Sequence, residues 1–455
     1  MKTDFINADF LLESPLARNL YHDYVEGLPV ADYHNHLNPA DLASDRSFSD
    51  IGELWVASDP YKHRAMRLHG EPEEFISGGG STRTKFDAWA RTLPSTLGNP
   101  LFHWSAMEMK NVFGLDEMPD EESAGRVWDA CNARLSEDSF STLGILRRFG
   151  VRFLSTSDDL LDDVSVHASV KGGVCATPSL RADSILGFGR EWMQRLCASA
   201  GACSAASLEE YLLLVRQRLD AFSTAGCRVA DHALDDGWRF EKCPYETAAR
   251  LYEEGSFSDV RLKSYVLGWL ASEYAGRGWA MLLHIGAQRF TSSRLRSLAG
   301  PAGGYASIGS PCDIRSLCAF LDSQDAAGLL PKTVLFTLNP ADNAALATLT
   351  GSYSEDGVAG KVQFGPAWWY NDHFLGMTEQ MECLMSYSLL PQFIGMTTDS
   401  RNVLSFSRHD YFRRILCNFM ADKALRGHSP SDEAYLGKIA SDIAYNNALS
   451  WIYGK

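Results

Sequence analysis

The chain has 455 residues, 45% of them hydrophobic and 22% charged, which is typical of a globular protein able to bury a large core. Its formal net charge of −15 argues against nucleic acid and against anionic membrane surfaces as partners. For the same reason, an anionic substrate would have to be bound by local arginines.

The N-terminus and the cysteines indicate the compartment. Residues 1–15 alternate acidic and apolar residues and lack the hydrophobic run of a signal peptide. No segment reaches the length needed to cross a bilayer. Ten cysteines, none of them in a C-x-x-C pair, favour reduced thiols over a disulfide framework or a zinc knuckle. We therefore expect a cytoplasmic protein.

Short apolar runs that end in polar or ionisable residues recur along the chain and predict eight strands. They are residues 30–36, 151–159, 173–181, 227–232, 279–284, 333–339, 361–366 and 392–399. Several lack polar–apolar alternation, as strands buried on both faces do. Helical spacing between the runs predicts helices, among them 208–222, 374–390 and 434–451. This order predicts an α/β fold, a (β/α)8 TIM-type barrel, with a doubly wound open sheet as the alternative.

The stretch between the first and second runs is far too long for one connecting helix. It contains helical pieces at 48–54, 85–92 and 127–135 and a glycine-rich surface loop. We interpret it as a helical insertion beside the barrel mouth. The predicted organisation is then residues 1–37 with the first strand, 38–150 as the insertion, and 151–455 as the remaining barrel and C-terminal helix.

Ionisable residues at the strand ends predict a metal site. Catalytic groups of such barrels lie at the C-terminal ends of the strands. The first run ends in His34 and His36, which share a face of an extended strand, the fifth ends in His284, and the eighth ends in Asp399. Imidazoles and a carboxylate around an open position are typical of a catalytic zinc site. Taken singly, His284 is also explained as a hydrogen-bonded core histidine and Asp399 as a helix cap.

Arginines and aromatic residues near these ends indicate an anionic, oxygen-rich substrate. Arg401 follows Asp399 by two residues, and Arg181 ends the third run. A guanidinium fork matches a carboxylate geometrically. Trp369 and its neighbour Trp368 suit either a wall against a sugar face or plain packing. Tyr61 lies in the insertion, from which it would reach over the mouth.

Longer motifs resemble a known family across essentially the whole chain. They are Asp9–Leu12, Phe86–Ala90, Gly98–Trp104, His284–Ala287, Leu338–Pro340, Gly365–Asp372 and Thr398–Arg401. In this order they resemble the uronate isomerases, also called glucuronate isomerases, of the amidohydrolase superfamily. The resemblance implies a (β/α)8 barrel that converts D-glucuronate to D-fructuronate and D-galacturonate to D-tagaturonate.

The resemblance also implies roles for single residues. It implies one divalent metal, held by His34, His36 and Asp399. Zinc is the expected ion, and manganese, iron and cobalt are also compatible with these ligands. Arg401, Arg181 and Tyr61 match positions that face substrate. His284 matches the strand-five histidine, which touches either metal or substrate.

The expected chemistry is proton transfer through an enediol. Asp399 is the general base, Arg401 stabilises the anionic oxygens, and Tyr61 donates a hydrogen bond to the sugar. Arg181 holds the uronate carboxylate, and His284 and Trp369 complete the substrate site.

One departure from the family pattern leaves alternatives open. Pro60 stands where the family usually has a histidine before the tyrosine. Proline cannot transfer a proton, so a sugar-acid binder with impaired catalysis is one alternative. A metal-dependent amide or lactone hydrolase is the other, although the fourth run ends in Asp231 and His232 without a metal-bridging lysine. The preferred uronate and the presence of a homo-oligomer stay open.

Overall fold

A parallel β-sheet forms the centre of the computed structural model, which describes residues 1–454. Its seven strands pair in the order β1-β2-β3-β4-β5-β8-β9. The bounds are β1 Val30–Asn35, β2 Val151–Asp159, β3 Cys175–Arg181, β4 Val229–Leu234, β5 Ala280–Ile285, β8 Thr333–Thr337 and β9 Val362–Phe364. All six pairings are parallel, so the seven C-terminal ends meet at one edge. A separate antiparallel pair, β6 Ala287–Gln288 and β7 Ser307–Ile308, follows β5.

Seven of the eight predicted strands are confirmed, and the eighth, residues 392–399, is wrong as a regular strand. The segment nevertheless lies beside β1, because the Asp399 N–H donates to the His34 carbonyl at 3.0 Å. Two residues interrupt the extended conformation: Gly395 and Asp399 have φ angles of 73° and 47°. At Gly395 a Cβ would lie 2.2 Å from the Ile443 carbonyl oxygen, so only glycine fits there. The Thr397 hydroxyl, instead of a backbone carbonyl, accepts the His34 N–H at 2.8 Å.

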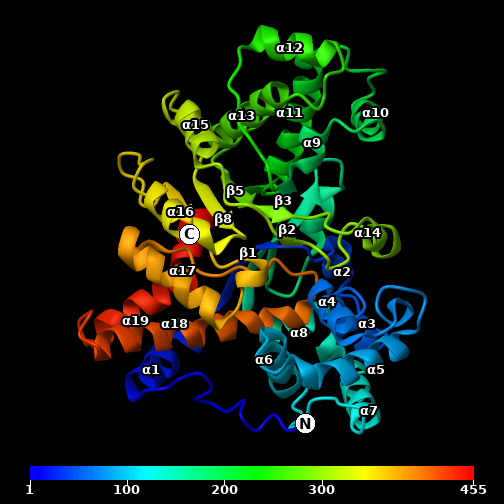
Figure 1. Cartoon of the computed structure of the whole chain (residues 1–455), viewed down its shortest axis with the longest axis vertical. Helices are drawn as coiled ribbons and strands as arrows, with labels where there is room; N and C mark the ends of the chain where they lie inside the picture. Colours follow the sequence, from blue (N-terminus) through cyan, green and yellow to red (C-terminus); the bar gives the residue numbers. More distant parts are fainter. Residues whose placement is uncertain (455) are drawn as a thin grey trace.

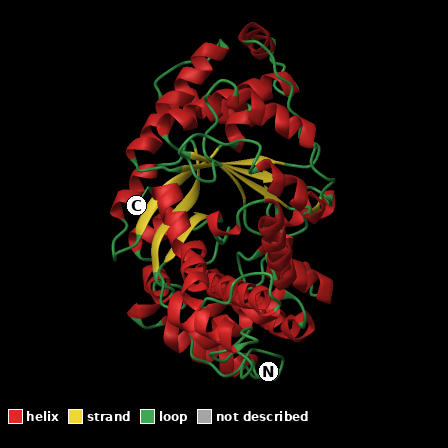
Figure 2. Cartoon of the chain, turned by 90° about the vertical axis from the view of Figure 1, so that its left-hand side faces the viewer, coloured by secondary structure: helices red, strands yellow, loops and turns green. Residues whose placement is uncertain are grey.

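Helices surround the sheet on its outer side and at both of its ends (Figures 1 and 2). After β3 they are α9 Asp183–Gly187, α10 Arg190–Ser199, α11 Leu208–Thr224, α12 Tyr245–Glu253, α13 Val260–Arg277, α14 Ser293–Ala299, α15 Ile314–Asp325, α16 Asn343–Leu349, α17 Phe374–Tyr387, α18 Ser407–Leu425, α19 Glu433–Ser441 and α20 Asn447–Tyr453. The predicted helices at 208–222 and 374–390 are confirmed as α11 and α17. A capping box between Ser207 and Glu210 fixes the start of α11. The predicted C-terminal helix is α19 and α20, joined by a π-helical turn at Asp442–Asn446.

The chain before β2 adds a second group of helices. They are α1 Pro15–Asn19, which precedes β1, and then α2 Pro39–Ser44, α3 Ile51–Trp55, α4 Pro60–His69, α5 Thr82–Thr92, α6 Pro100–Met107, α7 Ala124–Leu135 and α8 Thr142–Arg148. Helices α3 to α7 lie together on one side of the sheet, where the long helix α18 runs toward them (Figure 1). Helix α18 contacts α1, α6 and α17, so it ties the two ends of the chain together.

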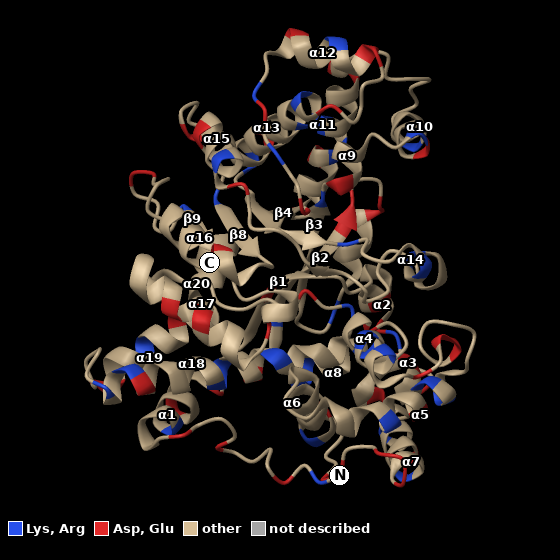
Figure 3. Ribbon diagram, in the orientation of Figure 1, with Lys and Arg blue, Asp and Glu red and all other residues tan. Residues whose placement is uncertain are grey.

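Several strands are buried on both faces, as predicted from their lack of alternation. Every residue of β1, β5 and β8 is buried. Charged residues lie mainly on the helices around them, where acidic and basic side chains are interspersed (Figure 3). Within residues 1–454, every helix is too short or too polar to pass through a lipid bilayer.

Candidate active site

A cavity of about 920 Å³ opens at the C-terminal ends of the strands. All the side chains predicted for the site line it: His34, His36, Tyr61, Arg181, His284, Trp369, Asp399 and Arg401. These residues come from the ends of three strands, β1, β3 and β5, from the segment that contains Asp399 and Arg401, from the loop after β9 and from helix α4. The topology therefore brings together residues that are up to 367 positions apart in the printed sequence.

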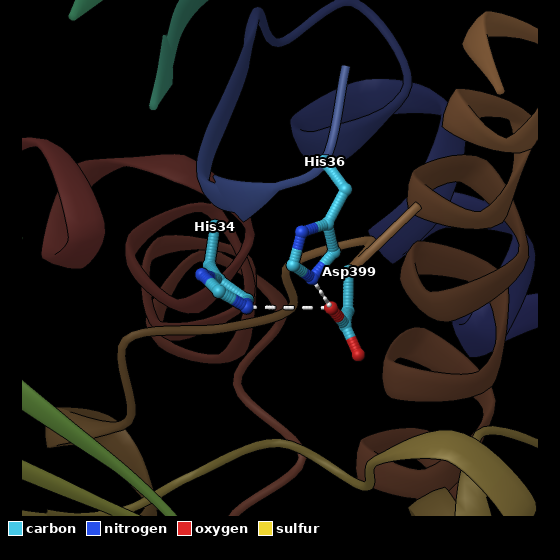
Figure 4. Close-up of side chains that lie close together, drawn as sticks. All are labelled: His34, His36 and Asp399. Carbon is cyan, nitrogen blue, oxygen red and sulfur yellow. Dashed lines mark ion pairs between the residues drawn. The ribbon is translucent and has the colours of Figure 1, made fainter. Parts of the chain in front are cut away.

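His34, His36 and Asp399 line the cavity, and their side chains lie close together at the centre of the candidate site (Figure 4). His34 lies in β1 and His36 follows its last residue, so both imidazoles point to one side, as the i, i+2 spacing predicts. Their Nε2 atoms lie 3.3 Å and 2.9 Å from Asp399 Oδ1. The three ligand atoms lie within 4.8 Å of one another, close enough to coordinate one cation.

The second carboxylate oxygen of Asp399 is held by two tryptophans. The indole N–H groups of Trp368 and Trp369 donate to Asp399 Oδ2 at 2.7 Å and 2.8 Å. Both Trp369 and Asp399 have a positive φ, near 48°, a conformation that costs free energy for residues other than glycine. The next helical turn is capped by Asn402, so the interpretation of Asp399 as a helix cap is wrong. Asp399 thus uses both oxygens within the site.

His284 adds a third imidazole behind this centre. Its ring stacks on Phe336 at 4.5 Å and lies 4.8 Å from the ring of His34. In the described chain, the buried Nε2 of His284 has no hydrogen-bond partner, which does not fit a hydrogen-bonded core histidine. A ligand atom of His284 also lies within 4.8 Å of ligand atoms of His34 and Asp231, which form a second candidate metal-binding group.

Burial and neighbouring charges perturb these groups in different directions. Burial opposes protonation of His34, but the Asp231 and Asp399 carboxylates outweigh it and raise the His34 pKa. Burial lowers the pKa of His36, and it lowers the pKa of His284 far below the ordinary value. Burial alone would raise the pKa of Asp399, yet the hydrogen bonds from His34 and His36 hold it well below its usual range. The centre thus holds an ionised carboxylate beside two imidazoles, those of His36 and His284, whose lowered pKa values favour the neutral form that binds metal.

Six arginines line the cavity, and Arg181, Arg289 and Arg401 differ in how they are paired. Arg181 Nε lies 3.1 Å from Asp183, and Arg289 Nε lies 2.7 Å from Asp235. Arg401 has no ion pair or hydrogen bond with any described residue, and its side chain is exposed to the cavity. Its guanidinium is therefore free to bind an anionic group.

Tyr61 reaches the cavity from the first turn of α4. Asp59 caps this helix by accepting the N–H groups of Tyr61 and Lys62 at 2.9 Å and 3.2 Å. Pro60 occupies the first helical position, which has no intrahelical acceptor for an N–H group. The Tyr61 ring packs edge-on against Trp104 at 6.0 Å. Burial raises the Tyr61 pKa well above its ordinary value, so its hydroxyl remains a hydrogen-bond donor.

Three features of the site were not predicted from the sequence. Asp231 ends the fourth run, so the strand-end rule that selects His284 also selects Asp231 as a candidate site residue. The indole bonds of Trp368 and Trp369 to Asp399 have no sequence signature. Arg289 follows β6 in a segment without periodicity, and its partner Asp235 is 54 positions away.

Comparisons with known proteins identify the family of the chain. A family model described as glucuronate isomerase matches residues 1–452. The uronate isomerase of Salmonella arizonae is 41% identical over 466 aligned positions, covering 98% of each chain. That of Bacillus licheniformis is 39% identical over 457 positions, covering 98% of this chain and 96% of the relative. The crystal structure of the Thermotoga maritima uronate isomerase superposes with a TM-score of 0.91 at 27% identity, covering 98% of this chain and 99% of that one. The chain therefore belongs to the glucuronate isomerase family and is an isomerase.

Proposed function

We propose that the chain interconverts D-glucuronate with D-fructuronate and D-galacturonate with D-tagaturonate. The observation that carries this proposal is the meeting of His34, His36 and Asp399 in a cavity that also presents the unpaired Arg401. The carboxylate of a hexuronate matches a guanidinium fork, and its carbonyl and hydroxyl oxygens match a Lewis-acidic centre. Family membership names the same substrate class.

We propose that one divalent metal ion, zinc by preference, is held by His34, His36 and Asp399. Two imidazoles and one carboxylate are a suitable donor set for zinc, which leaves room for a substrate oxygen. The unpartnered Nε2 of buried His284 supports a further ligand or substrate contact at the same place. When bound, the ion would polarise the sugar oxygens as a Lewis acid.

The chain's own residues would move one proton and hold the anionic groups. Asp399 removes the C2 proton of the ring-opened aldose and returns it to C1, while the O2 hydroxyl proton passes to O1, so that the C1 aldehyde becomes an alcohol and the C2 alcohol becomes a ketone. No oxidant is needed. Both oxygens of Asp399 already accept hydrogen bonds, so the proton transfer requires one of these bonds to open when substrate binds. Arg401 stabilises the enediol oxygens, and Tyr61 donates to the sugar.

The remaining side chains would position the substrate. Arg181 would hold the uronate carboxylate, because its pairing with the partly exposed Asp183 leaves donors free. His284 and Trp369 would border the sugar. In Trp369 the indole N–H is already bound to Asp399, so only the ring is available to the substrate.

For the architecture, we propose a (β/α)8 barrel in which residues 392–399 fill the place of the eighth strand. The Gln363 side chain of β9 donates to the Gln392 carbonyl at 3.0 Å, and the other end of the segment bonds to β1. We also propose that residues 38–150 are an insertion beside the mouth, between residues 1–37 and 151–455. The proposed location is the cytoplasm, and the proposed ligand is a small sugar acid.

Solvent-exchange analysis tests this reaction directly. In D₂O, purified protein with its metal should convert D-glucuronate to D-fructuronate that carries solvent deuterium at C1, observed by NMR. Asp399→Asn should lose turnover by about 10²–10⁴-fold, the contribution of a positioned general base. If Asp399→Asn keeps wild-type turnover, the proposed base is wrong. Metal analysis of the same sample identifies the ion, and parallel assays on both uronates establish the preferred one.

The same preparation separates the two alternatives. Hydrolysis of an amide or lactone panel without uronate isomerisation would support the hydrolase. Saturable uronate binding without turnover, in protein loaded with metal, would support the sugar-acid binder. Pro60 is the feature that favours the binder, and the free Arg401 beside an intact Asp399 favours catalysis.

A further inference from the structure

The segment that carries Asp399 depends on side chains for its position. It forms no regular series of backbone hydrogen bonds with either neighbouring strand, and Asp399 itself has a left-handed backbone conformation. Such a conformation persists only where surrounding contacts hold it. The position of the Asp399 carboxylate must therefore depend on groups that form hydrogen bonds with the residues just before it.

Asp32, in β1, is the principal hydrogen-bonding partner of this segment. Its Oδ2 accepts the Thr398 backbone N–H at 2.9 Å, and its Oδ1 lies 3.1 Å from the Thr397 hydroxyl. Asn35 donates to the same Oδ1 at 3.2 Å. Asp32 has no exposed surface and does not line the cavity, so it cannot touch the substrate. Its contacts instead fix the two residues that precede Asp399.

His409, in α18, completes the arrangement from the other side. Its Nε2 lies 2.8 Å from Asp32 Oδ2, and the ring is buried away from the cavity. The neighbouring Arg408 donates to the Thr398 carbonyl at 2.6 Å. Helix α18 thus holds Thr398 both directly, through Arg408, and indirectly, through Asp32. A buried carboxylate needs this many donors because an unpaired charge is costly to bury.

We propose that Asp32 and His409 form a positioning pair that sets the Asp399 carboxylate against His34 and His36. This inference rests on the proposed metal-dependent function, and it assigns the pair no contact with substrate. Partners one shell beyond a metal's ligands commonly change metal affinity or activity by about 10–100-fold when removed. The pair should therefore control assembly of the site and leave the substrate-binding arginines unaffected.

Two substitutions at His409 separate positioning from simple packing. His409→Gln keeps an N–H donor at nearly the same place, whereas His409→Met fills a similar volume without a donor. If His409 only fills space, the two variants behave alike. If it holds Asp32, His409→Gln retains most of the function and His409→Met does not. Asp32→Asn tests the other partner, because an amide cannot accept all four hydrogen bonds.

The measurements are zinc affinity, by competition with a chromophoric chelator, and kcat and KM for D-glucuronate. We expect His409→Met and Asp32→Asn to lower zinc affinity and kcat by about 10–100-fold, with far smaller changes in KM. His409→Gln should recover most of both losses. His167→Gln is the matched control, since His167 is a buried histidine with an Nε2 hydrogen bond outside the cavity, and it should keep wild-type zinc affinity.

Each outcome supports or overturns the inference. Folded variants, judged by circular dichroism, with wild-type zinc affinity and kcat overturn it. So do equal losses in His409→Gln and His409→Met. If Asp32→Asn fails to fold, the two His409 variants decide. Wild-type protein that turns over uronate without binding zinc or another divalent ion refutes the proposed metal site, which is a distinct result.

Discussion

Asp158, a buried carboxyl group at the end of β2, makes the stability of the folded chain depend on pH. Burial is the main cause that raises the Asp158 pKa from 3.8 to about 7. The charges of Asp162 and Asp231 add to this rise, whereas the hydrogen bond from the Thr156 hydroxyl opposes it. Its Oδ2 accepts the Thr156 hydroxyl at 2.7 Å, and the His167 Nε2 lies 3.6 Å away. Burial lowers the pKa of His167, so no imidazolium neutralises the carboxylate.

The sign and size of the effect follow from linkage. A carboxyl group whose pKa is raised in the folded state stabilises that state fully below about pH 4, and this contribution is lost as the pH rises through about 7. At about 1.36 kcal/mol per pH unit, the whole loss is about 4 kcal/mol, and about 2.5 kcal/mol of it falls between pH 5 and pH 8. Asp158→Asn keeps the shape and an acceptor but cannot ionise. Its free energy of unfolding should therefore rise by about 2.5 kcal/mol, relative to wild type, between these two pH values.

Urea unfolding at pH 5 and pH 8, followed by circular dichroism, measures this difference. Other titrating groups are common to both proteins, so they cancel in the comparison. The m-values should agree, because the surface exposed on unfolding is unchanged. Asp129→Asn, an exposed substitution on α7, controls for the loss of one charge. Parallel pH profiles of wild type and Asp158→Asn would refute the reasoning.

Four further predictions concern the candidate site. Trp369→Phe keeps an aromatic ring but removes an N–H donor to the ionised Asp399 carboxylate, so we expect zinc affinity or kcat to fall about 10–100-fold. Wild-type values of both zinc affinity and kcat would contradict the role of the indole hydrogen bond. Arg401→Lys loses the guanidinium fork, and steady-state kinetics should show kcat/KM for D-glucuronate reduced by about tenfold or more. Removal of metal by a chelator should lower the melting temperature, since saturation at about 1,000 times Kd adds about 4 kcal/mol, and an unchanged melting temperature would argue against a resident ion. Because Asp231 and Asp399 raise the pKa of His34, metal binding near pH 6 should release protons, measurable by calorimetry in buffers of different ionisation enthalpy.

Local patterns predicted most of the fold. The apolar runs that form β1, β5 and β8 lack polar–apolar alternation because both faces of these strands are buried. Their burial could therefore be predicted from their composition alone. Helices α11 and α17 carry their apolar residues at helical spacing, so their bounds were also predictable. The roles of the site residues stay predictions, although all of them line the same cavity.

Contacts between distant residues could not be predicted from these patterns. Residues 392–399 have the composition of a strand, but the left-handed backbone at Gly395 and Asp399 and the Thr397 side-chain bond replace regular pairing. The indole bonds to Asp399 depend on where the loop after β9 folds. Hydrogen bonds of this kind depend on tertiary structure, and no periodic pattern in the sequence predicts them.

The arrangement of His34, His36 and Asp399 has a consequence for biosynthesis. During translation, the nascent chain presents the two imidazoles early, but their carboxylate partner emerges from the ribosome only near the end of synthesis. The helix that carries His409 emerges later still. If these three residues hold the proposed cation, an ion captured early would meet an incomplete set of ligands, so metal loading would follow the emergence of nearly the entire polypeptide from the ribosome.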